Sequence, residues 1–510
     1  MASILLRGAR ALLGAQFSLS EPLDVAIEGG RIRAIAPEGR LPLAARVLDL
    51  HQRLLVPGMI NGHFHSHEHF QRGRTENLPL ELWMHCVRTP RPVTLTAREV
   101  YLRTMIGAVE CLRTGATTLV DDITLGTGID RTLIDAMLQA YDDIGVRALV
   151  GFAMMDRPVI DNFPFVDECG DAALIAQLRA LPRPSPEGFH ALVRDLARTR
   201  HPQANRVGVL VSCSAPQRCT ADFLRASRAL ADELDLPAIT HVQETRMQVV
   251  TGQRFYGSTM VEHLHALGFL KPKTTLIHTV WLNPREIDLL ARTGATAQHN
   301  PWSNLMLGSG VAPVRELLAA GGNVGMGVDG TCATFTANML TTAGSAAGVS
   351  KLRGDDPVQW LSAREALAIA TQGGARAFGL DGGNGPRLGT IEVGATADLC
   401  AFRLDTVTFT PLGDPVRQLI YNERGAGLDT VLVDGEPVMV QGRFTRIDEA
   451  ALLAEIGATV QRLAPEFDAA EASAAQVHAV MRKVLARCAE EPIAADTFAA
   501  RIETAPSASR

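Results

Sequence analysis

The chain has 510 residues, of which 46% are hydrophobic, and its formal net charge at pH 7 is −6. This length and apolar content suffice for one large barrel with additions or for two to four domains. Lysine and arginine form no basic block and no apolar run is long enough to cross a bilayer, so neither a nucleic-acid polymer nor a membrane is expected as a partner.

Short apolar runs separated by glycine and proline turns fill the first 56 residues, which predicts antiparallel β structure. The N-terminus is apolar, but Arg7 and Arg10 interrupt it and no clear cleavage signal follows, so we interpret it as a first strand. A targeting peptide is the alternative. The 8 cysteines include no C-x-x-C pair, which in so long a chain is typical of free thiols in a reducing compartment. We therefore expect a cytoplasmic protein.

From Leu54 onward, apolar β runs alternate with amphipathic helical stretches, the pattern of a parallel α/β architecture. The segment Arg157–Gln203 is long for one connection and rich in proline, so it is expected to hold an extra helix or a loop over the mouth of a site. Eight β runs over somewhat more than about 250 residues predict a (β/α)₈ TIM barrel, with strands at Leu54–His65, Thr117–Asp122, Arg147–Met154, Arg206–Cys213, Pro237–Thr245, Thr274–Leu282, Thr296–Asn300 and Asn323–Gly330.

Short strands return after Gly385, and Asp434-Gly435 between apolar runs is a hairpin signal. We predict that residues 1–56 and 385–447 form one small β-sandwich domain beside a barrel of residues 57–384. Residues 448–510 are expected to form alanine-rich helices, followed by a disordered tail that reads TAPSASR.

Several residues with metal-binding or acid–base side chains fall at the predicted strand ends, where the active sites of (β/α)₈ enzymes lie. A histidine at a strand end is more often a core or surface residue, and an aspartate before glycine is more often a turn residue. Their coincidence at four strand ends favours a site. The candidates are His63 and His65 on the first strand, His241 and Glu244 on the fifth, His278 on the sixth and Asp329 on the eighth. Three imidazoles and a carboxylate from this set would form a nitrogen and oxygen site that suits Zn²⁺ or Fe²⁺.

Four passages between Pro57 and Leu399 resemble the amidohydrolase superfamily, in its mononuclear branch of cytosine, guanine and adenosine-type deaminases and chlorohydrolases. They read PGMINGHFH, HVQET, HNPWSNLMLGSGVAPVRELLAAGGNVGMGVDG and GTIEVGATADL. The resemblance implies one divalent metal per chain, for which zinc is favoured over iron, and a homodimer or higher oligomer. It also implies that Glu244 shuttles a proton, that His278 orients the bound water, and that the metal ligands are His63, His65, His241 and Asp329.

The implied reaction is hydrolytic deamination of a small amino-substituted N-heterocycle, of purine, pyrimidine, pterin or triazine type. A bound metal lowers the pKa of water toward about 7, Asp329 can accept its proton, Glu244 can protonate a ring nitrogen, and His278 can stabilise the intermediate. Two alternatives stay open: loss of chloride or alkylamine from a triazine-like ring, and opening of a cyclic amide. A non-catalytic scaffold is a further alternative, but such a protein is expected to lose ligands that this chain retains.

The position of the first lysine, Lys271, bears on the number of metals. Dinuclear members of the superfamily typically bridge two metals with a carboxylated lysine on the fourth strand, and no lysine precedes residue 271. That bridge cannot form here, although a glutamate bridge remains possible.

The substrate contacts are expected in the loops after the strands. Gln71 could recognise a ring edge, Trp83 could form a wall of the pocket or pack in the core, Trp302 follows the seventh strand, and Asn304 could contact substrate or support a loop. We do not expect His67 and His69 to be ligands, because a catalytic zinc needs only three or four.

The fourth strand departs from the family pattern. It ends in Ser214-Ala215-Pro216, whereas the family usually has His-Ala-Pro. This departure leaves the metal site intact and argues against assuming a nucleoside substrate.

Overall fold

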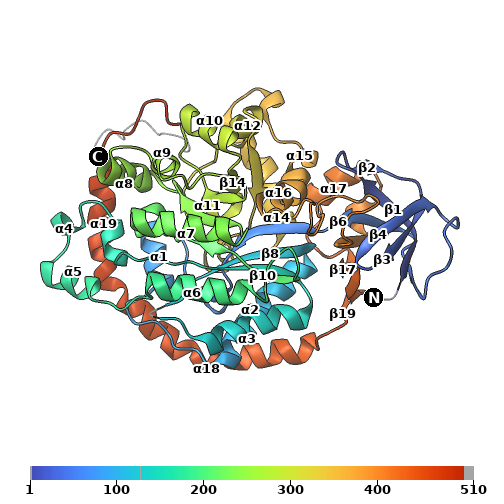
Figure 1. The fold of residues 1–510 in the computed structure, drawn as a ribbon, viewed down its shortest axis with the longest axis horizontal. Helices are drawn as coiled ribbons and strands as arrows, with labels where there is room; N and C mark the ends of the chain where they lie inside the picture. The colour runs from blue at the N-terminus through green and yellow to red at the C-terminus, as the bar shows by residue number, and fades with distance from the viewer. Residues whose placement is uncertain (1–2, 127, 499–510) are drawn as a thin grey trace.

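A large α/β body carries a smaller β unit at one end, and the two C-terminal helices run along the outside of the body (Figure 1). The computed structural model describes residues 3–126 and 128–498. The TAPSASR tail lies outside these residues. Among the helices of the described part, none has the length and apolar character needed to cross a bilayer.

The β unit is built from both ends of the chain. Its ten-stranded mixed sheet has the order β19-β18-β17-β16-β6-β1-β3-β4, with β2 and β5 also paired to β1. The segments meet where β6 pairs in antiparallel fashion with β16. The Asp434-Gly435 hairpin has positive φ at both turn residues. The strands are β1 (Ile4–Leu13), β2 (Ser18–Leu19), β3 (Leu23–Glu28), β4 (Arg31–Pro37), β5 (Arg46–Asp49), β6 (Arg53–Pro57), β16 (Leu399–Arg403), β17 (Leu428–Val433), β18 (Glu436–Val440) and β19 (Arg443–Phe444).

The single strand predicted over Leu54–His65 is wrong, because the chain changes sheet at Gly58. β6 belongs to the mixed sheet, whereas β7 (Met59–Phe64) pairs with β8 in a parallel sheet. A Cβ added at Gly58 would lie 2.1 Å from Thr117 Oγ1, so only glycine fits where the chain passes between the two sheets.

The other strands of the α/β body are all parallel. They form a four-stranded sheet, β10-β9-β8-β7, and a five-stranded sheet, β11-β12-β13-β14-β15. Isolated parallel bridges join Phe64 to Asp329 and Met154 to Cys213, so residues of the two sheets pair at both edges. The strands are β8 (Ala116–Ile123), β9 (Arg147–Phe152), β10 (Val207–Val209), β11 (Val211–Ser212), β12 (Ala238–Val242), β13 (Thr274–His278), β14 (Thr296–His299) and β15 (Asn323–Met326).

Helices alternate with these strands and cover their outer side. Helices α2, α9, α10 and α15 begin with capping boxes, in which an N-cap Thr, Asn or Ser and a Glu three residues later satisfy backbone N–H groups. The expected extra helix between β9 and β10 is present as α5. The helices are α1 (Leu80–Val87), α2 (Ala97–Arg113), α3 (Arg131–Ile144), α4 (Val166–Cys169), α5 (Ala172–Arg179), α6 (Pro186–Ala197), α7 (Ala221–Glu233), α8 (Arg246–Tyr256), α9 (Met260–Ala266), α10 (Pro284–Thr293), α11 (Pro301–Met306), α12 (Val314–Ala319), α13 (Thr331–Thr334), α14 (Met339–Val349), α15 (Ala363–Ala368), α16 (Gly374–Ala377), α17 (Pro415–Tyr421), α18 (Glu449–Ser473) and α19 (Ala475–Glu490).

Apolar side chains from the parallel strands pack together in one buried cluster. Neighbouring strands contribute one residue each, and residues around α16 complete the cluster. Burial of these side chains fixes the strands against one another and so fixes where their C-terminal ends lie. The residues are Ile60, Val120, Leu149, Ile239 and Ile277 from five strands, and Leu210 from between β10 and β11.

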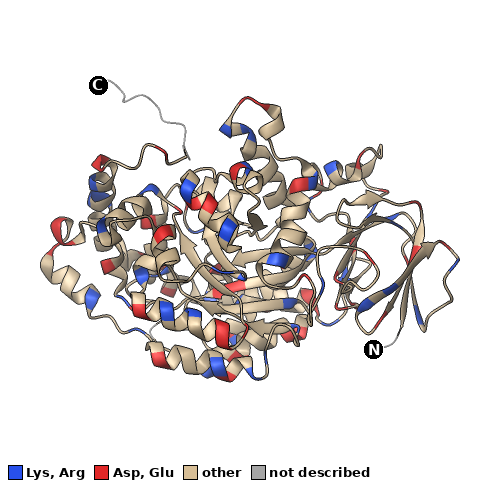
Figure 2. Ribbon diagram, turned by 45° about the horizontal axis from the view of Figure 1, so that its top comes forward, with Lys and Arg blue, Asp and Glu red and all other residues tan. Residues whose placement is uncertain are grey.

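Charged residues of both signs are interspersed along the outer helices (Figure 2). Several ion pairs join partly exposed side chains on these helices, such as Arg98 with Glu455 and Arg131 with Asp195. Such a mixed surface is not the one-signed stripe that binds a nucleic-acid polymer.

Candidate metal centre and active site

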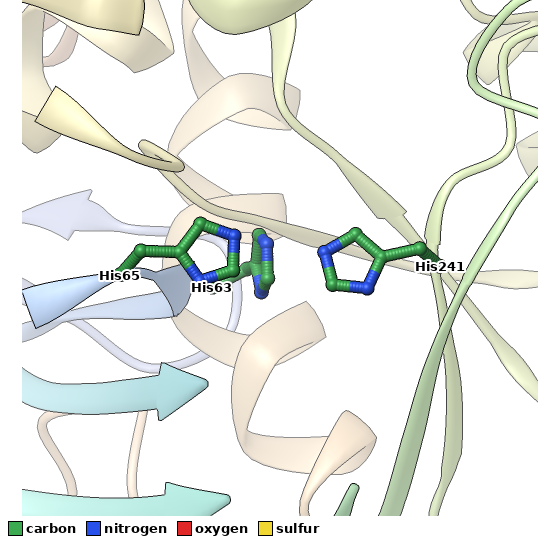
Figure 3. Close-up of side chains that lie close together, drawn as sticks. All are labelled: His63, His65 and His241. Carbon is green, nitrogen blue, oxygen red and sulfur yellow. The ribbon is translucent and has the colours of Figure 1, made fainter. Parts of the chain in front are cut away.

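Three histidines from two distant strands turn their rings toward one point (Figure 3). The ring centroid of His63 lies 4.6 Å from that of His65 and 4.9 Å from that of His241. His63 lies in β7 and His65 directly follows that strand, while His241 lies in β12. One ligand atom of each lies within 4.8 Å of the others, the spacing of a shared ion.

Asp329, which follows β15, brings a carboxylate to the same point. Its Oδ1 lies 3.4 Å from His63 Nε2 and 3.3 Å from His65 Nε2. The Ser303 hydroxyl donates to Asp329 Oδ2 at 2.6 Å, and the Gly330 N–H donates to Oδ1 at 2.8 Å. These bonds hold the carboxylate in place against the imidazoles.

Backbone carbonyls orient two of the histidines. His65 Nδ1 lies 2.5 Å from the Asp122 carbonyl oxygen, and His241 Nδ1 lies 2.8 Å from that of Ser214. A carbonyl only accepts, so each Nδ1 carries the proton and each Nε2 keeps a free lone pair. Metal-binding histidines in proteins are oriented in this way.

The residues present fit a divalent metal. His63 is buried, yet neither of its ring nitrogens has a hydrogen-bond partner in the described part of the chain. Buried polar atoms are nearly always satisfied by protein or solvent, so such an orphan indicates a ligand. Imidazole nitrogens and a carboxylate oxygen are donors that Zn²⁺ accepts in catalytic sites.

Glu244 and His278 stand beside these ligands. His278 Nε2 lies 3.4 Å from Glu244 Oε2 and 3.8 Å from Asp329 Oδ2. On the other side of the ring, His278 Nδ1 lies 3.1 Å from Asn304 Oδ1, which fixes the ring's orientation. Glu244 Oε1 is buried without a partner among the described residues. Glu244 and His278 thus face the point where the candidate metal ligands converge.

Burial shifts the protonation of this pair toward the neutral forms. Burial, with the Asp329 carboxylate adding to it, raises the pKa of Glu244 well above its ordinary value. Burial lowers the pKa of His278 to about 4.

The backbone at this end of the strands is strained. Gln243, His278, Thr279 and Asp329 all have φ between 47° and 75°, in the left-handed region that non-glycine residues rarely adopt. Strained residues of this kind cluster at functional sites, where the surrounding structure holds them in place.

A small cavity of about 30 Å³ opens onto the candidate metal ligands. Trp83 forms part of its wall, as one of the two interpretations of this residue predicted. Gln71 instead lines a neighbouring cavity of about 280 Å³, and Asn304 contacts His278. Trp302 lines neither cavity, and its indole N–H donates to the Thr334 carbonyl at 2.9 Å. The lining of the small cavity is His65, Glu68, Leu80, Trp83, Met84, Val87, Arg88, Arg218, His241, Glu244, His278 and Asp329.

Glu68, in the stretch from His67 to Gly73 that was expected to line the mouth of the site, does line this cavity. Sequence reasoning missed two other charged residues of the lining, Arg88 and Arg218. Arg218 lies two residues after the Ser-Ala-Pro departure, which was the available signal for it. Arg88 follows α1 and carries no such sequence signal.

Comparison with known proteins shows what this chain resembles. The 5-methylthioadenosine/S-adenosylhomocysteine deaminase of Nitratidesulfovibrio vulgaris (Miyazaki F strain) is 34% identical over 435 residues, which cover 85% of this chain and 91% of that protein. The 5'-deoxyadenosine deaminase of Methanothermobacter thermautotrophicus is 31% identical over 427 residues, covering 84% and 91%.

Solved structures are similar along nearly the whole chain. Zinc-complexed atrazine chlorohydrolase from Arthrobacter aurescens has a TM-score of 0.80 at 25% identity, covering 90% of this chain and 100% of that one. A zinc-bound adenosine deaminase from Xanthomonas campestris has a TM-score of 0.78 at 27% identity, covering 91% and 98%. The amidohydrolase family itself matches residues 54–438, which confirms the resemblance in the motifs, so this chain belongs to the amidohydrolase family.

Proposed function

We propose that this protein is a metal-dependent aminohydrolase that deaminates an amino-substituted N-heterocycle. It is a hydrolase of carbon–nitrogen bonds other than peptide bonds, as its deaminase relatives are by name. One observation carries the proposal: the Glu244 and His278 pair faces the convergence of three histidines and Asp329.

The site belongs to a (β/α)₈ barrel in this proposal, with a composite β domain from residues 1–56 and 385–447. Support comes from the parallel bridges at both edges of the two sheets and from the cluster that takes one residue from each of several neighbouring strands. Active sites of such barrels lie at the C-terminal ends of the strands.

His63, His65, His241 and Asp329 would hold one divalent metal, which we take to be zinc because zinc is bound in two similar structures. When bound, the metal supplies a Lewis acid that brings the pKa of a coordinated water near neutrality. Asp329 Oδ2, which faces His278, can take up a proton from the attacking water.

Glu244 and His278 would carry out the remaining proton transfer and hydrogen bonding. Glu244 is placed to donate a proton to the ring nitrogen beside the attacked carbon, which makes that carbon electrophilic. His278 keeps its proton on Nδ1 against Asn304, so Nε2 can accept a hydrogen bond from the attacking water. The departing amino group takes up the proton held by Asp329 and leaves as ammonia, while the proton of the added hydroxyl returns to Glu244 as the product carbonyl forms.

A second function is favoured by the similarity to atrazine chlorohydrolase, which points to chloride or alkylamine as the leaving group. The same residues serve both reactions, since the leaving group changes and the attack on a ring carbon does not. A homo-oligomer in the cytoplasm completes the proposal, and the 8 free cysteines of the chain suit a reducing compartment.

The test is ammonia release by zinc-loaded protein across aminopurines, aminopyrimidines, pterins and aminotriazines, with Glu244→Gln as the control. Release that disappears in the variant supports the deaminase, and metal analysis should find about one zinc per chain. Chloride or alkylamine release without ammonia would favour the second function. A correctly folded protein that binds no metal would overturn both.

A further inference from the structure

Two arginines reach the cavity of the metal centre from separate elements. Arg218 ends the short turn that follows β11, and Arg88 directly follows α1. Both line the small cavity together with His241, Glu244 and Asp329. Neither has a role in the hydrolytic steps derived above.

Arg218 is buried with most of its donors unused. Arg218 is only 5% exposed to solvent. Nη1 donates to the Ser214 hydroxyl at 3.1 Å, and Nη2 contacts the Met84 sulfur, a weak acceptor, at 3.1 Å. Nε has no partner. A guanidinium offers five N–H donors in a rigid fork, so three donors of Arg218 have no acceptor among the described residues.

Arg88 repeats this arrangement. Its Nη1 is buried and has no hydrogen-bond partner among the described residues. Within the described part of the chain, no carboxylate lies within 4.0 Å of the guanidinium of Arg88 or Arg218, although Glu68 and Glu244 line the same cavity. Burying a guanidinium without an ion-pair partner costs folding free energy. The positions of Arg218 and Arg88 are explained if a ligand supplies the anion.

The position of Arg218 is tied to the metal ligands. Ser214 accepts from Arg218 through its hydroxyl and from His241 Nδ1 through its carbonyl. The guanidinium and the imidazole are therefore anchored to one residue, which restrains the arginine fork relative to the candidate ligand His241. Arg88 lines the larger cavity as well, so it stands where the two cavities adjoin.

We infer that Arg218 and Arg88 bind a carboxylate carried on the ring of the substrate, so the substrate is an acidic amino-heterocycle. This inference rests on the proposed function in placing an amino ring at the metal. The planar fork of arginine pairs with a carboxylate through two parallel hydrogen bonds, which fixes orientation as well as affinity. The ring is thereby held with one chosen carbon toward the metal centre.

The test is calorimetric binding of matched acid and neutral pairs to zinc-loaded protein carrying Glu244→Gln, so that turnover does not interfere. The pairs are pterin-6-carboxylate with pterin, cytosine-5-carboxylate with cytosine, and 2-aminopyrimidine-5-carboxylate with 2-aminopyrimidine. We expect at least one acid to bind about 10- to 100-fold more tightly than its neutral partner. Arg218→Gln should abolish the preference, and Arg218→Lys should leave part of it because the charge remains and the fork is lost.

Arg228→Gln is the matched control. Arg228 is also 5% exposed and its Nε has no partner among the described residues, but it does not line the cavity, and its Nη1 and Nη2 donate to Thr274 and Asp232. Its loss should therefore leave the preference intact. Arg88→Gln provides a second variant should Arg218→Gln fail to fold. Equal binding of acid and neutral partners, a preference that survives in both variants, or no binding by any acid would overturn the inference.

These outcomes separate the inference from the proposed function. Tight binding of an acid that releases no ammonia with the unmutated enzyme would support the arginine site and count against the deaminase. Ammonia release from neutral rings alone, unchanged in Arg218→Gln, would do the reverse.

Discussion

Two regions of this molecule bury charged side chains, and they satisfy them differently. Where the mixed sheet meets the parallel strands, Arg147 donates to both carboxylate oxygens of Asp398 at 3.0 and 3.1 Å. Asp398 also accepts the Asp434 N–H at 2.7 Å. At the candidate metal centre, by contrast, both ring nitrogens of His63 and one oxygen of Glu244 have no hydrogen-bond partner in the described structure.

The difference separates a structural use of buried charge from a functional one. A buried ion pair with every lone pair satisfied holds its two elements in one arrangement, and removal of one partner leaves an uncompensated charge. A buried polar atom without a partner costs folding free energy and is retained where a ligand satisfies it. Mutation of the junction should therefore change stability, whereas mutation of the centre should change activity.

The largest effect is expected at the centre. Glu244→Gln keeps the side-chain shape and removes the proton donor, so kcat for ammonia release should fall by about 10²- to 10⁴-fold. The thermal midpoint should not fall, because Glu244 Oε1 has no hydrogen bond to lose. Steady-state kinetics and thermal unfolding of the zinc-loaded variant measure the two quantities.

Glu99→Gln is the control for this prediction. Glu99 is buried in the capping box of α2, away from the cavity, so its variant should lose stability and keep its kcat. A Glu244→Gln enzyme with near-normal kcat would remove Glu244 from the reaction.

At the junction, Arg147→Met should destabilise the fold by about 3–5 kcal/mol, because Asp398 is then left buried and unpaired. Denaturant unfolding measures this loss, and kcat of the folded fraction should be unchanged. The comparison variant is Arg206→Met, whose partner Glu436 is half exposed, with an expected loss of at most about 1 kcal/mol. Equal losses in the two variants would contradict the structural role assigned to the buried pair.

Removal of the metal should leave the buried polar groups of the candidate site unsatisfied and so lower the stability of the fold. Chelation leaves the buried His63 ring without a partner, and a ligand present at about 100 times its Kd contributes about 2.7 kcal/mol to the folded state. The unfolding midpoint should therefore drop on chelation and recover when zinc is added back. A His63→Ala variant should show no such response, and a midpoint insensitive to chelation in the unmutated protein would argue against the metal.

The candidate metal ligands could be picked out in the sequence because each lies near the end of a β run or within three residues after it. In a parallel α/β fold the strand ends converge, so strand order alone brings His63, His241 and Asp329 together. Glu244 and His278 could be picked out for the same reason.

The remaining features depend on tertiary contacts that no local pattern encodes. Gly58 divides the first run because Thr117 leaves no room for a side chain there. Trp302 follows a strand as a contact residue should, but its indole N–H is engaged by the Thr334 carbonyl. Whether an arginine such as Arg218 has an ion-pair partner is decided by residues far from it along the chain.

The smallest effect is expected at a buried carboxylate that is only partly satisfied. Glu286 Oε2 accepts the Asn283 N–H at 2.8 Å while Oε1 has no partner, and burial raises its pKa to about 7. Because the folded state then holds a proton that the unfolded chain releases near pH 4.5, stability is lost as pH rises from about 5 to 7. Glu286→Gln keeps the capping oxygen and should remove this loss, so its thermal midpoint should exceed that of the unmutated protein at pH 8 and match it at pH 5.

Glu365→Gln tests the opposite sign. Burial acts to raise the pKa of Glu365, but hydrogen bonds from Arg315 and Ser362 lower it, so this variant should be less stable than the unmutated protein at pH 8.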